Sequence, residues 1–250
     1  MVGVYVDDLI ITGSNQVDID AFKSEMHSTF KMSDLGCLHY YLGLEVSQSE
    51  EGVTLCQNAY ATKILETVGM TGCKSTCTPM EPHLKLSKLS IASAVDPTHY
   101  RSIVGSLRYL VNTRPDLAYS MGYVSRFMEN PTTEHLGAVK RILRYISRTF
   151  SYGCQYQRKE EEARLLGYSD SDQAGDIDTR KSTTGVLFFL GNNPVTCLIA
   201  IAVAEQTSLL LLPLVQAAIA EGPRDVPEDP LDWPQMLGGR VFHEPTHIAH

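Results

Sequence analysis

Two adjacent carboxylates, Asp7 and Asp8, lie between two short apolar runs near the start of the 250-residue sequence. The runs, residues 2–6 and 9–12, are β-prone, so the stretch predicts a tight β-hairpin with both acids at or near its turn. Neighbouring negative charges repel each other, which makes the pair costly unless a cation lies beside it. Mg²⁺ takes one or two carboxylates together with substrate phosphate oxygens, so the pair could serve phosphoryl or nucleotidyl transfer. An Asp-Asp pair is also ordinary turn chemistry, and the dipeptide alone favours that interpretation.

Length and composition are typical of a globular protein with a sizeable core. Hydrophobic residues make up 43% of the chain and charged residues 20%, so wholesale disorder is not expected. The formal net charge is −8, whereas a protein that coats nucleic acid should be basic. The 6 cysteines are too sparse for a disulfide scaffold and fit no metal motif, which favours reduced thiols in the cytoplasm or nucleus. The first residues, MVGVYVDD, lack the basic segment of a signal peptide.

Charge is distributed unevenly along the chain. Between residues 101 and 150, eight basic residues are opposed by three acidic ones, which leaves this segment at +5. Between residues 197 and 250, seven acidic residues outnumber two arginines, which gives −5. A polyanion could therefore approach the middle of the chain but not its tail. The tail also contains two apolar runs, which are separated by a Glu-Gln pair and interrupted by a proline, so a membrane anchor is not expected.

The first 95 residues predict strands and helices in alternation. After the hairpin, apolar residues at helical spacing predict an amphipathic helix with an inner face of Ile19, Phe22, Met26 and Phe30. Residues 40–46 and 53–56 predict two further strands, joined by the polar turn SQSEEG. A second helix is predicted to be capped by Asn58 and to end at Gly69. Residues 73–93 predict a polar loop.

Three helices and two strands are predicted after this loop. The helices start at Asp96-Pro97, at Pro115 and at Asn130-Pro131. The third has an inner face of Leu136, Val139, Leu143 and Ile146, and its outer half carries Lys140, Arg141, Arg144 and Arg148. These cations fit a solvated face as well as a track for phosphates. Residues 165–169 and 185–190 predict strands with a polar connection between them.

The motifs resemble those of a known family. YVDDLIITGSN is similar to the Tyr-x-Asp-Asp hairpin of reverse transcriptases. The downstream segments FKMSDLGCLHYYLGLEV, YATKILETVGM, CKSTCTPM, YRSIVGSLRYLVNTRPDLAYSMGYVSRFMENPTTEHLGAVKRILRYI and LLGYSDSDQAGDIDTRKSTTGVLFFLG resemble the copia-type retrotransposon polyprotein, in the expected order. The resemblance covers residues 2–196.

The resemblance implies an α+β fold in four parts. Residues 1–80 would be the C-terminal half of a reverse-transcriptase palm, and residues 81–160 a helical thumb or connection. Residues 161–196 would be the opening strands of a truncated ribonuclease H-like sheet. Residues 197–250 would be an irregular, divergent tail. The implied function is that of a fragment of an RNA-directed DNA polymerase with ribonuclease H, from an element that encodes its own DNA integration.

The resemblance also implies roles for individual residues. Asp7 matches the acid that coordinates the catalytic metal ions, Asp8 its neighbour, and Tyr5 the aromatic near the primer end or the incoming nucleotide. Tyr41, Leu42 and Gly43 resemble the turn that grips the primer. The basic residues Lys140, Arg141, Arg144 and Arg148 would meet phosphates, and Asp170 matches the first metal-binding acid of ribonuclease H. The implied cofactor is Mg²⁺ or Mn²⁺, and the implied partner is an RNA or DNA template-primer, with nucleotides as the small substrates.

Departures from the family predict that the chain is catalytically incomplete. The family places fingers and a further metal-binding Asp before the hairpin, and it has Trp where this chain has Gln173. Its later ribonuclease H acids are not recognisable in the tail. Codons for residues 208–213, read two bases later, can spell Val-Ala-Leu-Thr-Ser, which is close to the family's segment. The tail is therefore hypothesised to be a frame-shifted translation, which the coding DNA would test.

Other interpretations stay open at this stage. The chain could be a non-enzymatic nucleic-acid-binding or interaction module that uses the basic helices of residues 101–148. It could also act in trans with the other half of an intact polymerase. Asp172 and Asp176 are interpreted as loop acids rather than metal ligands. The histidines near the end (His243, His247 and His250) fit a frayed polar tail better than a zinc site, because Pro245 breaks a helix there.

Overall fold

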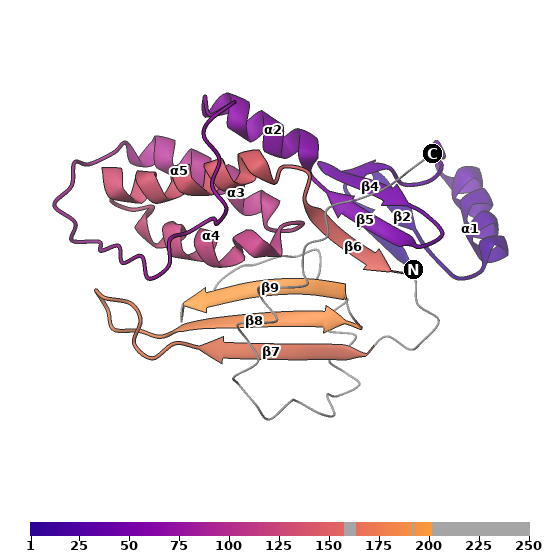
Figure 1. Ribbon diagram of the computed structural model, residues 1–250. Helices are drawn as coiled ribbons and strands as arrows, with labels where there is room; N and C mark the ends of the chain where they lie inside the picture. Colours follow the sequence, from indigo (N-terminus) through magenta and orange to yellow (C-terminus); the bar gives the residue numbers. More distant parts are fainter. Residues whose placement is uncertain (158–163, 192, 202–250) are drawn as a thin grey trace. The chain divides into compact units, whose positions relative to one another are not determined.

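The computed structural model describes residues 1–157, 164–191 and 193–201 (Figure 1). The chain separates into two compact units, Met1–Leu42 and a second unit that begins at Gly43. Helices and strands are both present, which confirms the α+β class. None of the helices in the described ranges combines the length and the apolar character that are needed to cross a bilayer. The expectations for residues 202–250 lie outside the described residues.

The first unit contains the predicted hairpin. Strand β1 (Val2–Tyr5) pairs antiparallel with β2 (Asp8–Ile11), and backbone hydrogen bonds between Met1 and Thr12 close its open end. Helix α1 (Gln16–Thr29) and the short strand β3 (Tyr40–Tyr41) complete this unit.

Helix α1 begins at Gln16 because Asn15 caps it. The Asn15 side-chain oxygen accepts the N–H of Val17 at 3.0 Å. Ile19, Phe22 and Met26 are half-buried, as the predicted inner face requires, but Phe30 lies beyond the helix and is 55% exposed. No side chain in residues 1–42 is fully buried, so the apolar interior of the first unit is thin.

The second unit contains an antiparallel sheet in which β5 (Gly52–Cys56) pairs with β4 (Leu44–Gln48) on one side and with β6 (Gly153–Gln157) on the other. Gly52 has a φ of +155°, and a Cβ there would collide with the carbonyl oxygen of Tyr156. Only glycine therefore allows β6 to approach β5 at this point. Strand β6 comes much later in the chain than β5, so the helices between them form a path along which the chain returns to the sheet.

This return path consists of four helices. They are α2 (Asn58–Thr67), α3 (Pro97–Leu110), α4 (Ala118–Val124) and α5 (Thr133–Arg148). Two 3₁₀ turns, η1 (Pro115–Leu117) and η2 (Ser125–Phe127), flank α4. The predicted polar loop, residues 73–93, contains no helix or strand.

The predicted start of α3 is confirmed. The Asp96 carboxylate accepts the N–H groups of Thr98 at 3.0 Å and of His99 at 3.1 Å, and Pro97 is the first helical residue.

Two other predicted helix starts are wrong by one to three residues. Asn58 is the first residue of α2 and not its cap, since Gln57 is the cap residue and the N–H of Ala59 is instead bound by Glu45 at 2.8 Å. Helix α5 begins at Thr133, and Thr132, which has an extended backbone, separates it from the Asn130-Pro131 pair. In α2 the group that binds the first turn, Glu45, is distant in the sequence, whereas in α5 it is His135 of the first turn itself.

His135 completes the start of α5. The N–H of Thr132 donates to His135 Nδ1 at 2.9 Å, so the imidazole does what Glu or Gln does in a capping box. The ring proton is therefore assigned to Nε2, which lies 3.2 Å from the carbonyl oxygen of Ser87. The ring is fully buried and stacks on Phe127 with 4.0 Å between centroids. Burial lowers the pKa of His135, although the Ser87 carbonyl and two nearby carboxylates act in the opposite direction.

The helices enclose one apolar core. Leu136 is half-buried and the other three residues of the inner face predicted for α5 are fully buried. The largest contributions come from α3 and α5: Tyr100, Ile103, Val104, Leu107, Leu110, Val139, Ile142, Leu143 and Ile146. Burial of this many large side chains is the main source of stability for the second unit.

A buried ion pair lies beside this core. Arg114 is 1% exposed, and its guanidinium group donates to both carboxylate oxygens of Asp116 at 2.9 and 2.7 Å. Its other N–H groups donate to the carbonyl and the hydroxyl of Thr149 at 2.7 and 2.8 Å. The Tyr145 hydroxyl donates to Asp116 at 2.9 Å, and the rings of Tyr145 and Tyr152 lie 5.6 and 5.3 Å from the guanidinium carbon. The pair is therefore desolvated but fully hydrogen-bonded.

A separate three-stranded sheet follows in the order β7 (Leu165–Ser171), β8 (Thr183–Leu190) and β9 (Asn193–Ile201), with antiparallel pairing throughout. The two strands predicted here correspond to β7 and β8. Backbone pairing in β9 runs through the expected boundary between residues 196 and 197 and continues to Ile201, opposite Thr183.

Removal of the Asp116 charge should expose the cost of burying Arg114. We expect Asp116→Asn to lower the free energy of unfolding by roughly 3 kcal/mol, because breaking one side of a buried pair leaves an uncompensated charge. Unfolding in urea, monitored by far-ultraviolet circular dichroism, measures this free energy. Glu81→Gln is the matched control, because the Glu81–Arg141 pair is partly exposed and should contribute less than about 1 kcal/mol. Equal effects of the two substitutions would contradict the assignment.

His135 should make stability depend on pH. Its pKa is lowered in the folded chain, so the unfolded chain takes up the proton first, and stability should fall as the pH decreases below about 6.5. We expect this loss between pH 7.5 and 5 to be smaller in His135→Gln and unchanged in His99→Gln, whose side chain is exposed. Urea midpoints at the two pH values measure it. An unaltered pH dependence in His135→Gln would refute the prediction.

Candidate functional site

The two candidate acids lie at the turn of the β1–β2 hairpin. Val6 and Asp7 form the turn, and Asp8 is the first residue of β2, directly opposite Tyr5. Both acids are exposed. Val6 has a φ of +54°, which is strained for a β-branched residue. The hairpin thus presents two adjacent carboxylates on a backbone that is held in an unfavourable conformation.

Tyr41, the last residue of β3, belongs to the same unit as the hairpin. Burial, followed by the negative charge of Asp8, raises the pKa of the Tyr41 phenol. A charge has this effect only when it lies close by. The fold therefore brings together three of the residues singled out from the sequence, namely Tyr5, Asp8 and Tyr41.

The predicted strand 40–46 is interrupted by a tight turn. Strand β3 ends at Tyr41 and β4 begins at Leu44. Leu42 and Gly43 between them have φ values of +50° and +83°, so the extended backbone is interrupted here. The trio Tyr41, Leu42 and Gly43 lies where the first unit passes into the second.

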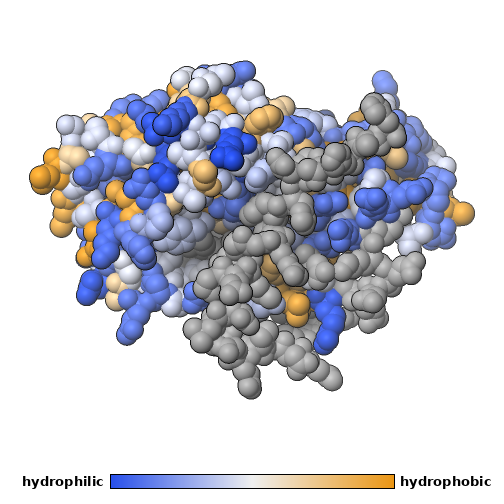
Figure 2. Space-filling view, in the orientation of Figure 1, coloured by the Kyte–Doolittle hydropathy of each residue, from blue (hydrophilic) through white to orange (hydrophobic). Residues whose placement is uncertain are grey.

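Three of the four candidate cations form an exposed row on α5. Lys140, Arg144 and Arg148 follow each other at four-residue spacing, which is a rise of about 6 Å along a helix. Arg148 also donates to the Cys77 sulfur at 3.3 Å. Within the described ranges none of the three takes part in an ion pair. Figure 2 shows hydrophilic residues mixed with small apolar areas over the helical part of the visible face.

Arg141, the fourth candidate cation, is fastened to the polar loop before α3. It is half-buried, and it forms an ion pair with Glu81 at 2.8 Å and a hydrogen bond to the Thr78 hydroxyl at 3.0 Å. These contacts favour a structural role for Arg141 over a contact with phosphate.

Asp170 lies on β7, opposite Gly185, and is exposed. Its side-chain oxygen accepts the N–H of Ser171 at 2.8 Å. Side chains alternate along a strand, so Asp170 shares a face of the sheet with Tyr168.

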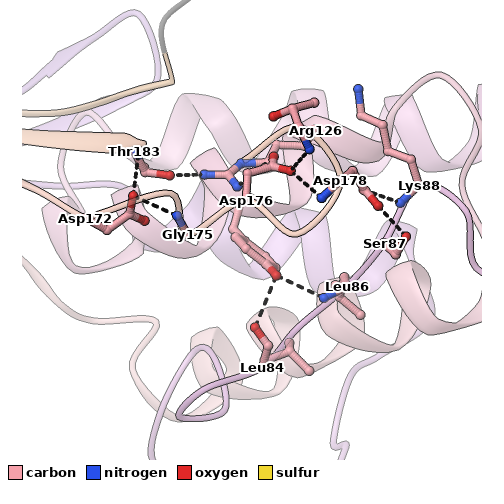
Figure 3. Close-up of polar contacts among 12 residues, drawn as sticks. Leu84, Leu86, Ser87, Lys88, Arg126, Asp172, Gly175, Asp176, Asp178 and Thr183 are labelled. Atoms are coloured by element: carbon pink, nitrogen blue, oxygen red, sulfur yellow. Dashed lines mark hydrogen bonds and ion pairs between the residues drawn. The ribbon is translucent and has the colours of Figure 1, made fainter. Parts of the chain in front are cut away.

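The loop acids between β7 and β8 accept hydrogen bonds from their own loop (Figure 3). Asp172 accepts the N–H of Thr183 at 2.7 Å and that of Gly175 at 3.3 Å. Asp176 accepts two backbone N–H groups that follow it, at 2.9 Å each. Burial acts to raise the pKa of Asp176, but these N–H groups and the charge of Arg126 outweigh it and lower the pKa. The geometry agrees with the interpretation of Asp172 and Asp176 as loop acids.

Arg126 is a residue that the sequence did not single out. Its side chain is 9% exposed, lies 3.4 Å from the Asp176 carboxylate and donates to the Thr183 hydroxyl at 2.6 Å. The guanidinium carbon also lies 5.0 Å from the centroid of the Tyr123 ring. A weak signal was present in the sequence, because Arg126 interrupts a run of apolar residues that predicts burial.

The described residues fit a metal ion only in part. No group of three or more His, Cys, Asp and Glu residues in the described ranges could hold an ion. Asp7 and Asp8 provide two carboxylates, which is the share that a protein usually gives to Mg²⁺ when phosphates and waters complete the shell. Asp170 provides one carboxylate. The hairpin therefore fits an ion that is shared with a substrate, and not an ion enclosed by protein ligands.

Comparisons with known proteins place the chain in a family. Residues 1–82 match the family model described as "Reverse transcriptase (RNA-dependent DNA polymerase)". The chain is 42% identical to the "Retrovirus-related Pol polyprotein from transposon RE1" of Arabidopsis thaliana over 193 residues, which are 77% of this chain and 13% of the relative. It is 39% identical to the corresponding polyprotein from transposon TNT 1-94 of Nicotiana tabacum, of which it covers 15%. No solved structure matches the chain.

A shorter relative is matched over most of its length. The chain is 40% identical to the "Uncharacterized mitochondrial protein AtMg00810" of Arabidopsis thaliana over 77% of this chain and 80% of the relative. The chain spans about one seventh of the two transposon polyproteins, so it corresponds to one portion of them. With these identities and the reverse-transcriptase match, the chain belongs to the copia-type retrotransposon polyprotein family.

Proposed function

We propose that this chain is a portion of a copia-type reverse transcriptase that runs into the start of ribonuclease H. In this proposal residues 1–80 are the C-terminal half of the palm, residues 81–160 the thumb or connection, and residues 161–196 the first part of a ribonuclease H-like sheet. The observation that carries the proposal is the exposed Asp7-Asp8 pair at a strained hairpin turn. The reverse-transcriptase match over residues 1–82 supports the same part of the chain.

The hairpin residues have distinct tasks in this proposal. Asp7 and Asp8 would hold Mg²⁺ or Mn²⁺, which neutralises charge on transferring phosphates when it is bound. Tyr5, directly opposite Asp8, would offer an aromatic face to the primer end or the incoming nucleotide. Tyr41, Leu42 and Gly43 would guide the primer strand at the tight turn. Asp170 would belong to the ribonuclease H-like part.

The chain as it stands is proposed to be catalytically incomplete. Two-metal phosphoryl transfer needs carboxylates that hold both ions. Within the described residues, no third His, Cys, Asp or Glu joins the two hairpin carboxylates in a group that could hold a metal ion. Loss of one member of such a site costs orders of magnitude in rate.

Two measurements on the full chain test this proposal. Mn²⁺ should broaden the nuclear magnetic resonance signals of the Tyr5, Asp8 and Leu9 amides, and this broadening should disappear in the Asp7→Asn/Asp8→Asn variant because both ligands are removed. Primer extension on an RNA template with Mg²⁺ should give no product above that of Asp7→Asn.

The two results bear on different parts of the proposal. Broadening that persists in the double variant would refute metal binding at the hairpin. Extension that the wild-type chain performs and Asp7→Asn does not would refute incompleteness.

A second candidate function is sequence-independent binding of nucleic acid by the second unit. The observation that favours it is the exposed row of Lys140, Arg144 and Arg148 on α5. Phosphates attract such cations without regard to base sequence, and binding releases counterions.

This function predicts a salt-dependent affinity for single-stranded DNA. The variant Lys140→Gln/Arg144→Gln/Arg148→Gln should flatten the slope of log affinity against log salt by about 2, at about 0.7 per lost phosphate contact. Fluorescence anisotropy with a labelled oligonucleotide at several salt concentrations measures it. The matched control is Lys63→Gln/Lys85→Gln/Lys88→Gln, which removes three exposed cations from other positions. An equal change of slope in both variants would show that the row on α5 contributes no more to DNA binding than other exposed cations.

A further inference from the structure

The helical segment, defined here as residues 73–148, binds two carboxylates of the β7–β8 loop at neighbouring points (Figure 3). Arg126, in η2, meets Asp176 at 3.4 Å. Asp178 is bound by the polar loop before α3, where the Ser87 hydroxyl donates to one carboxylate oxygen at 2.5 Å and the N–H of Lys88 donates to the other at 2.7 Å. Two acids that are two positions apart in the chain are thus recognised by separate donors.

The surface that binds Asp178 is itself held in place. The Tyr123 hydroxyl accepts the N–H of Leu86 at 3.0 Å and donates to the carbonyl oxygen of Leu84 at 3.1 Å. The carbonyl of Ser87 is bound by buried His135 at 3.2 Å. The segment around Ser87 is therefore tied to α4 and to α5, so its donors are in position before the loop arrives.

Two residues of the β7–β8 loop have backbone conformations that are unfavourable for their residue types. Ala174 and Arg180 have φ values of +56° and +57°, which are costly for residues with a side chain. At Gly175 a Cβ would collide with the Asp172 carboxylate, so the loop closes tightly on that acid. Such conformations persist only where surrounding contacts determine them. Asp176 and Asp178 connect this loop to the helical segment, and Asp172 connects it to the first residue of β8.

We propose that the β7–β8 loop, residues 172–182, is a latch that fastens the β7–β9 sheet to the helical segment through Asp176 and Asp178, with Arg126 as its positioning residue. The face of the helical segment around Arg126 and Ser87 is an interaction surface for a peptide with two carboxylates two residues apart, and its partner is this loop of the same chain. Arg126 also binds the Thr183 hydroxyl at 2.6 Å, at the first residue of β8, so it acts on the loop and on the strand together.

The latch determines how firmly the sheet is attached, and strand pairing determines how the sheet itself forms. Apolar contacts are non-directional, whereas the bonds made by Arg126 and Ser87 need a defined geometry. Loss of the latch should therefore free the start of β8 and leave the core of α5 unaffected. This separation of effects distinguishes a latch from general stabilisation.

Hydrogen exchange of the full chain, followed by mass spectrometry, tests the proposal. In Arg126→Gln we expect the amides of residues 172–187 to exchange about tenfold faster or more, which corresponds to the loss of one buried charged contact. Asp178→Asn should accelerate the same amides, because it releases the second point of attachment. Peptides from α5 should exchange as in the wild type in both variants.

Arg180→Gln is the matched control, because it removes an exposed arginine from the same loop. Its exchange should match that of the wild type. Arg126→Lys keeps the charge but not the planar group that reaches Asp176 and Thr183 together, so its effect should be intermediate. Wild-type exchange in Arg126→Gln or in Asp178→Asn would overturn the proposal, and so would equal acceleration of the α5 peptides.

Discussion

The buried guanidinium group of Arg114 determines much of the path of the second unit. A cation without water must be neutralised and hydrogen-bonded, because its desolvation would otherwise cost several kcal/mol. Here Asp116 supplies the charge, and Thr149 accepts two further hydrogen bonds. These contacts join the start of η1 to the end of α5. The chain leaves α5 at this point and enters β6 at Gly153, so β6 is positioned by the same group.

Buried polar groups recur at other junctions of the second unit. His135 links the first turn of α5 to the loop before α3, and Arg126 links η2 to the β7–β8 loop. The apolar core between α3 and α5 supplies most of the stabilising burial, but apolar contacts tolerate small displacements. Hydrogen bonds to a buried charge or imidazole do not, because an unmatched partner is costly. The core therefore holds the helices together, and the buried polar groups fix which segments meet.

The sequence allowed those elements to be predicted whose determinants are local. The β1–β2 hairpin follows from alternating apolar runs around Asp7 and Asp8, and the start of α3 follows from Asp96-Pro97, because a cap acts on residues two or three positions away. The predicted start of α2 is wrong because the distant Glu45 binds its first turn, and that of α5 because the local capping box of Thr132 and His135 lies beyond the Asn130-Pro131 pair.

Long-range pairing could not be predicted from the sequence. Arg126 and Asp176 are 50 residues apart, and no periodicity connects them. The exposed row on α5 followed from helical spacing, but the engagement of Arg141 with Glu81 depended on the course of a loop that has no repeating pattern. At the candidate site, the acids and Tyr5 could be predicted from a motif, whereas the proximity of Tyr41 to Asp8 required the fold.

The absence of any fully buried side chain in residues 1–42 has a thermodynamic consequence. The heat-capacity increase on unfolding arises from apolar surface that becomes hydrated, and the first unit has little such surface to expose. A calorimetric transition of the chain therefore reports on the helical core and its sheets. The hairpin that carries Asp7 and Asp8 can open and close with almost no thermal signal. The two adjacent carboxylates of the candidate site thus lie in the part of the chain to which calorimetry is least sensitive.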